Sequence, residues 1–200
     1  MGVHAQRETF RDQDHVRFHP IITQGGDLVN VVPSDVRMES YVRAGTVEAM
    51  KDANVKINRA LQAGAMAVGA TVEIQDRPGY LPLSNDANMN AFYRKNAEAL
   101  MGEDRVWIAG HMAGSTDTGD LSHIMPVTHP WIGTVTGSLH GNTYEVFDQD
   151  LAYIQTAQVM AMTVIDLLYG EAEEAEKVMA EFKPIFNKEE YLKFMESFKS

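Results

Sequence analysis

The chain has 200 residues, of which 44% are hydrophobic, and a formal net charge of −11. This composition supports a packed core and excludes wholesale disorder, while the negative charge argues against nucleic acid or an anionic membrane as a partner. No cysteine is present, which excludes disulfides and thiolate metal ligands and favours a cytoplasmic location. We also expect no transmembrane helix.

Short strands and helices alternate in the first hundred residues. Alternating apolar and polar positions predict strands over 15–22 and 36–43, and a helical spacing of apolar residues begins at Thr46. A further short strand is expected over 71–75. Asn85–Asp86 can cap a helix that runs to about Met101.

The second half contains more loop and one long helix. Two apolar segments, 106–108 and 131–136, are strand candidates. Asp148 or Asp150 caps a long helix through Tyr169, whose apolar residues cover a broad face. Two shorter helices follow, separated near Pro184.

The polar region between residues 110 and 148 is the main candidate for a functional site. It holds four of the seven histidines, and ionisable side chains on loops are where sites are usually built. These histidines are His111, His123, His129 and His140. His140 follows a β-rich stretch and precedes a capped helix, which suits a metal ligand at a sheet end. The simpler alternative is a solvated loop with scattered histidines.

Several polar residues are candidates for substrate binding. The loop Gly114–Asp120 could present Gly114, Ser115 and Thr116 to a carboxylate or an oxyanion, or it could be a turn stabilised by its own side chains. Arg43 points the same way as Tyr41, away from the buried face of its strand.

The arginines have a specific use in such a site. Arg43 and Arg77 could each clamp an anionic substrate through paired hydrogen bonds. The alternative is an ion pair across the sheet with Glu39 or Glu73. Asn30 could direct its amide to a carbonyl group or cap its own turn.

Ordered motifs make the sequence similar to a known family. Residues 25–35, followed by Tyr41-Val-Arg43, resemble the Gly-Gly…Asn-Val-Ile-Pro…Val-Arg pattern of the di-zinc amidohydrolases and carboxypeptidases, such as carboxypeptidase G, aminoacylases and indole-acetyl-amino-acid hydrolases. Residues 63–73, 114–120 and 139–140 match in the same order. The motif Ser-Thr-Asp-x-Gly-Asp at residues 115–120 is most similar to the aminobenzoyl-glutamate utilisation subgroup. The whole resemblance covers about residues 7–168.

The resemblance implies an α/β, more specifically α+β, architecture. It implies a partial ferredoxin-like lid and dimerisation domain, lacking its first strand and helix, over 1–103 with the connecting helix. The C-terminal portion of a zinc-peptidase catalytic domain would follow over 104–200. His140 would be a ligand of one of two Zn or Mn ions. Asn30 and Arg43 would reach substrate across a homodimer, and the loop at 114–116 would line the pocket.

One departure limits the implied activity. No histidine here has an Asp two residues on, and the Glu-Glu pairs lie in acidic segments near the end of the chain. A catalytic zinc usually needs three protein ligands. We therefore expect an incomplete amidohydrolase or peptidase, which alone binds no metal tightly and cleaves no N-acyl amino acid. The alternative is a non-catalytic dimerisation or ligand-binding module. His140, Asn30, Arg43 and Arg77 remain the main candidate site residues.

Overall fold

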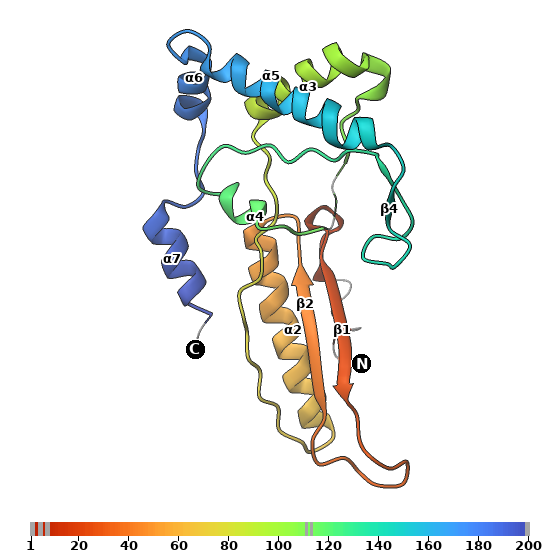
Figure 1. The fold of residues 1–200 in the computed structure, drawn as a ribbon. Helices are drawn as coiled ribbons and strands as arrows, with labels where there is room; N and C mark the ends of the chain where they lie inside the picture. Colours follow the sequence, from red (N-terminus) through yellow and green to blue (C-terminus); the bar gives the residue numbers. More distant parts are fainter. Residues whose placement is uncertain (1–2, 4–5, 7–8, 111, 113, 199–200) are drawn as a thin grey trace. The chain divides into compact units, whose positions relative to one another are not determined.

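The computed structural model describes residues 1–200 except 1–2, 4–5, 7–8, 111, 113 and 199–200. The described chain mixes helices with small antiparallel sheets, which confirms the predicted α+β class (Figure 1). It divides into two compact units. The first comprises residues 1–82, 111–116 and 195–200, and the second comprises residues 83–110 and 117–194.

The helices and strands follow one another in a simple order. The strands are β1 (Arg17–Gln24), β2 (Arg37–Arg43), β3 (Val135–Thr136) and β4 (Glu145–Val146). The α-helices are α2 (Val47–Ala67), α3 (Ala87–Met101), α4 (Thr118–Leu121), α5 (Thr156–Leu168), α6 (Glu173–Glu181) and α7 (Lys188–Glu196). Short 3-10 turns occupy Asp12–Asp14 and Glu103–Arg105, and a π-helical segment, η4 (Asp150–Gln155), leads into α5.

The first unit is built from a hairpin and one helix. β1 and β2 pair antiparallel, with Arg17 opposite Arg43 and Ile22 opposite Met38. Thr46 caps α2 by accepting a hydrogen bond from the Ala49 N–H at 3.1 Å, as the sequence indicated. α2 packs against β2 and buries Ile57. The two strands and the helix after them agree with the predicted order.

The strand expected over 71–75 is not formed. Residues 70–82 run without regular structure, because a strand needs a neighbour for its backbone groups and the described sheet joins only β1 and β2. Side chains hold the segment instead. The Asp76 carboxylate accepts hydrogen bonds from Asn54 and Asn58 of α2, each at 2.8 Å.

The second unit is centred on the pairing of α3 with α5. Tyr93 and Ala97 of α3 bury Val159 of α5. Asp86 caps α3 by accepting from the Met89 N–H at 2.8 Å, and Gly102 ends it at a positive φ of 95°. Both ends agree with the prediction. α3 packs against α5 within the second unit.

Two further expectations in the second unit need correction. Residues 106–108 form no strand, and only Val135–Thr136 of the segment 131–136 is extended into a ladder. The helix Asp150–Leu168 is long and apolar enough, by length and composition, to cross a membrane, contrary to the expectation that no stretch approaches this. The buried helix of a soluble protein satisfies the same criteria.

Candidate functional site

Two of the predicted substrate-binding residues lie together in the first unit. Nη1 of Arg43 donates a hydrogen bond to the Ser115 hydroxyl at 2.8 Å, across 72 positions of sequence. Arg43 is half-buried at the end of β2, and Ser115 is exposed. The strand fixes the direction of the Arg43 side chain, because side chains alternate between the two faces. The contact therefore joins two motifs that the sequence analysis selected separately.

The surroundings of Arg43 favour the binding interpretation over a cross-strand ion pair. Its guanidinium carbon lies 5.6 Å from the centre of the Tyr41 ring, a cation–π distance. Glu39 lies on the same face, yet it forms no ion pair within the described part of the chain. A guanidinium can bind a carboxylate through two parallel hydrogen bonds, which is the chemistry considered for Arg43.

Asn30 lies away from Arg43 within the chain. It is exposed in the loop that joins β1 to β2, whereas Arg43 lies at the opposite end of the hairpin (Figure 1). At about 3.3 Å per residue, the six steps from Arg37 to Arg43 alone span roughly 20 Å. Asn30 and Arg43 are therefore not close neighbours within one chain. Strand alternation gave the direction of Arg43 but carried no information on the path of the loop.

Arg77 is presented by the segment that Asp76 attaches to α2. The two asparagines that bind the Asp76 carboxylate are separated by one helical turn, so both amides reach the same side of α2. Arg77 itself is exposed, and Glu73 binds the Gln75 amide instead of forming the ion pair considered for it. This anchor was not predicted from the sequence. An Asn pair at positions i and i+4 was the available signal.

The second half of the 114–120 loop serves local structure. The Asp117 carboxylate accepts from the Thr118 N–H at 2.9 Å at the start of α4, and the Ser122 hydroxyl donates to the Gly119 carbonyl at 2.6 Å. For Asp117 the self-stabilised turn is the correct interpretation. Gly114 and Ser115 are exposed, and Thr116 is half-buried.

His140, the predicted metal ligand, lies in the second unit on the loop between β3 and β4. It is exposed and has a left-handed backbone with φ of 63°. Gly137 allows the tight loop, since a Cβ there would lie 2.0 Å from the Thr143 carbonyl oxygen at a φ of 83°. The Gly141 N–H closes a turn on the Ser138 carbonyl at 2.8 Å. Non-glycine residues in this conformation are uncommon and deserve a functional test.

Two other histidines of the region have structural surroundings. His123 is buried against the edge of Phe186, and its carbonyl oxygen accepts from the N–H groups of Ile185 and Phe186. The His129 ring contacts Trp131 edge-on, and the backbone N–H of His129 donates a hydrogen bond to the Asn85 side-chain oxygen at 3.0 Å. His111 lies outside the described residues. The histidine-rich region is thus divided between core packing and an exposed loop.

A complete metal site is not assembled by the described residues. No group of three or more His, Cys, Asp or Glu side chains among them is placed to hold a metal ion. Because a catalytic zinc usually has three protein ligands, the exposed His140 loop does not by itself fit one. No catalytic step can be built from it alone.

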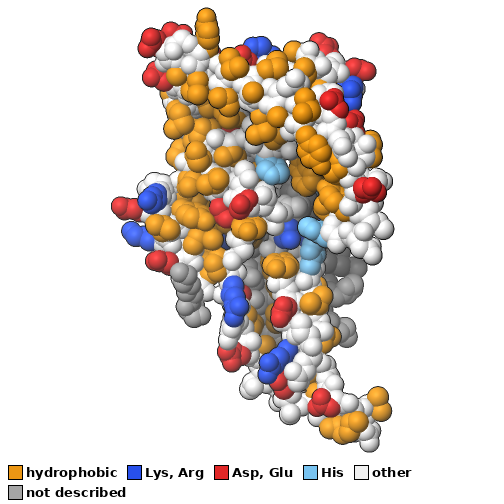
Figure 2. Space-filling view, viewed as in Figure 1, with side chains coloured by type: hydrophobic (Ala, Val, Ile, Leu, Met, Phe, Trp, Pro, Cys, Tyr) orange, Lys and Arg blue, Asp and Glu red, His pale blue; other side chains and the backbone are white. Residues whose placement is uncertain are grey.

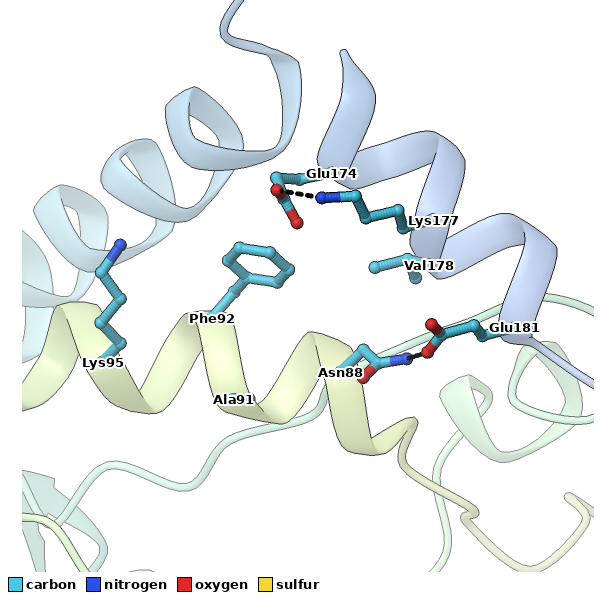
Figure 3. A pocket seen from close by; sticks show the side chains of 8 residues that line it. All are labelled: Asn88, Ala91, Phe92, Lys95, Glu174, Lys177, Val178 and Glu181. Atoms are coloured by element: carbon cyan, nitrogen blue, oxygen red, sulfur yellow. Dashed lines mark hydrogen bonds and ion pairs between the residues drawn. The ribbon is translucent and has the colours of Figure 1, made fainter.

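Two surface hollows among the described residues lie away from the predicted site residues. One, of about 310 Å³, opens between α3 and α6 over the ring of Phe92 (Figure 3). Two pairs of its lining side chains bind each other, Lys177 to Glu174 at 2.7 Å and Asn88 to Glu181 at 2.9 Å. Another, of about 360 Å³, lies beside Thr46 in the first unit. Neither is lined by a predicted site residue.

Most of the chain is similar in sequence to known dipeptidases. The sequence is 30% identical over 186 residues to the Xaa-Arg dipeptidase of Mus musculus, covering 88% of this chain and 42% of the relative. It is 28% identical over 190 residues to the Xaa-Arg dipeptidase of Homo sapiens, covering 90% of this chain and 43% of the relative. These similarities support a peptidase or amidohydrolase family.

The similarities do not extend to a narrower subgroup or to the full length of the relatives. They do not support the narrower aminobenzoyl-glutamate subgroup. No protein-family model matches the chain. The chain spans less than half the length of the curated relatives that it matches.

Proposed function

We propose that this chain supplies substrate-binding elements and one metal ligand to a metal-dependent peptidase or amidohydrolase that cleaves the amide bond of an N-acyl amino acid. The contact between Arg43 and Ser115 is the observation that carries the proposal. It joins two motifs of the family resemblance, and the similarity to dipeptidases supports the same chemistry. Arg43 would hold the substrate carboxylate, with Gly114, Ser115 and Thr116 beside it.

The substrate class follows from a fixed positive charge next to a hydroxyl. A guanidinium binds a carboxylate through two parallel hydrogen bonds, and a free carboxylate ends both dipeptides and N-acyl amino acids. The relatives are named for Xaa-Arg dipeptides, so these are the first substrates to test, with aminobenzoyl-glutamate as the second. Arg77, on its anchored segment, is a further contact to the anionic end.

The proposed site requires more than one polypeptide region. His140 would be one ligand of a pair of Zn or Mn ions, and the remaining ligands would come from residues that this chain does not contain. Asn30 lies at the far end of the hairpin from Arg43, which suits a homodimer in which Asn30 of one copy serves the site of the other. Each described strand of the hairpin pairs on one side only, and open strand edges favour association.

We infer the location and the remaining partners from composition. The absence of cysteine and the net charge of −11 support a cytoplasmic protein with a small-molecule substrate, without a nucleic-acid or membrane partner.

Binding and hydrolysis test separate parts of the proposal. Titration of the chain with an Xaa-Arg dipeptide should show weak binding that Arg43→Ala reduces at least tenfold, while Arg37→Ala leaves it unchanged. Arg37 is a suitable control because it lies on the same strand and pairs with Asp35. Binding that is indifferent to Arg43, or hydrolysis by the chain alone that a chelator abolishes, would contradict the proposal. A binding-only outcome in a completed assembly would favour the non-catalytic ligand-binding module.

A further inference from the structure

Two arginines stand opposite each other at one end of the β1–β2 hairpin. Arg17 of β1 is the register partner of Arg43 of β2. Directly opposite residues of an antiparallel pair share one face of the sheet, with Cβ atoms about 4.5–5.5 Å apart. Arg17 therefore lies on the face from which Arg43 reaches Ser115. Figure 2 shows Lys, Arg and His side chains at the surface over the region of the hairpin in this view.

The pair has no acid of the same face beside it. The next positions on this face are His19 opposite Tyr41, and only the pair after them contains an acid, Glu39. Four residues of strand separate Glu39 from Arg43, which is roughly 13 Å between their Cα atoms. The side chain of Arg17 is exposed and forms no ion pair or hydrogen bond with the described residues.

An acid at this end of the hairpin is already occupied. The backbone carbonyl of Asp14 accepts from the Gly45 N–H at 2.7 Å, which places Asp14 beside the end of β2. Its carboxylate accepts two hydrogen bonds from the Arg11 guanidinium, at 2.9 and 2.8 Å. Like charges directly opposite each other destabilise a sheet, so the repulsion between Arg17 and Arg43 calls for an anion from outside this hairpin.

We propose that Arg17 is a second substrate-binding residue, which acts together with Arg43 on one carboxylate of the substrate. A carboxylate has two oxygens that can accept about four hydrogen bonds, so it can bind both guanidinium groups at once. Its negative charge would offset their repulsion. This inference rests on the proposed function for the ligand class, which is the free terminal carboxylate of a dipeptide or an N-acyl amino acid.

The two arginines have different roles in this arrangement. Arg43 is held by the Ser115 hydroxyl at 2.8 Å and lies over the Tyr41 ring, so its direction is set before a ligand arrives. Arg17 has no such contacts and becomes ordered when the carboxylate binds. Arg43 thus orients the carboxylate, while Arg17 adds charge, and the affinity depends on both.

Titration of the full 200-residue chain with alanyl-arginine and with its C-terminal carboxamide tests the inference. We expect Arg17→Ala to weaken binding of the free dipeptide by about fivefold or more, and Arg17→Lys to retain part of the affinity, because a charge-assisted contact is lost or weakened. The carboxamide should bind the parent chain weakly and respond to Arg17→Ala by less than about twofold.

Arg37→Ala is the matched control for the dipeptide. Arg37 lies on the same hairpin at the far end of the ladder, opposite Gln24, and its guanidinium is bound to Asp35. This variant should leave the affinity unchanged. A parent chain that binds neither ligand, or an Arg17→Ala variant that weakens both ligands equally, would overturn the inference.

Two further measurements separate binding from a structural role. The double variant Arg17→Ala with Arg43→Ala should lose less affinity than the product of the two single losses, because both residues act on the same carboxylate. Without ligand, Arg17→Ala should melt at the same temperature as the parent chain or higher, since it removes a like-charge pair. A lower melting temperature, or losses that multiply, would contradict the shared carboxylate.

The outcome is separable from that of the proposed function. Carboxylate binding that needs both arginines, in a completed assembly that hydrolyses no dipeptide, keeps the arginine pair and removes the function. Hydrolysis that depends on Arg43 but is unchanged by Arg17→Ala keeps the function and removes the arginine pair.

Discussion

Arg43 and His140 are held by very different kinds of structure. Arg43 ends a seven-residue strand that is paired along its length and covered by α2. His140 lies in a loop between two strands of two residues each, in a left-handed conformation. The first position is set by regular structure and the second by one glycine, Gly137. Arg43 is thus placed by a paired strand, whereas the position of His140 depends on a tight turn that Gly137 allows.

The largest effect on the free energy of unfolding is expected from a change in α2, the helix that packs against the strand of Arg43. Ile57 is 1% exposed in α2, so Ile57→Ala removes buried methyl groups and leaves a cavity. We expect a loss of about 2–5 kcal/mol in the free energy of unfolding, measured by urea denaturation. Val55→Ala, on the exposed side of the same helix, should change it by less than about 0.5 kcal/mol. Equal losses for the two variants would show that α2 does not support the hairpin as described.

Adding a single methyl group at Gly137 should disrupt the loop that carries His140. Gly137→Ala forces an L side chain into a positive φ and into the Thr143 carbonyl, so the β3–β4 hairpin should open. We expect a cost of more than about 1 kcal/mol, with loss of amide protection at residues 135–146. Gly133→Ala is the control, because a Cβ there meets nothing within 4 Å. Unchanged protection in the Gly137 variant would contradict the role of this glycine.

These two regions show what the sequence could and could not predict. Alternation in 36–43 and the caps at Thr46 and Asp86 are local signals, and the strand and both helix starts followed from them. The failed strand at 71–75 lacked a partner strand, which no local pattern reveals. The contact between Arg43 and Ser115 spans 72 residues, so the residue types could select both as candidates but could not place them together.

The stability that Asp166 contributes to the pairing of α3 with α5 should decrease at acidic pH. The Asn96 amide, and then Lys95, lower the pKa of Asp166 below its ordinary value of 3.8. A carboxyl group with a depressed pKa in the folded state contributes stability above its unfolded pKa, and this contribution is lost as pH falls through the folded pKa. Below about pH 4, Asp166→Asn should therefore cost less stability than at pH 7. A pH-independent difference between the variant and the parent would contradict this assignment.

The smallest effect on stability is expected at Arg43 itself. Its hydrogen bond to Ser115 is exposed to solvent, so Arg43→Ala should change the free energy of unfolding by less than about 0.5 kcal/mol. Thermal denaturation measures this. A large loss of stability together with unchanged ligand affinity would make Arg43 a structural residue and remove it from the proposed site.

The most direct test of the proposed function is hydrolysis of an Xaa-Arg dipeptide with zinc or manganese added, by the chain alone and after addition of the region that the relatives have and this chain does not span. We predict no chelator-sensitive hydrolysis by the chain alone. We also predict hydrolysis by the completed assembly that a chelator, His140→Ala and Arg43→Ala each abolish, whereas His129→Gln leaves most of it. Chelator-sensitive hydrolysis by the chain alone, or a completed enzyme indifferent to His140, would contradict the account.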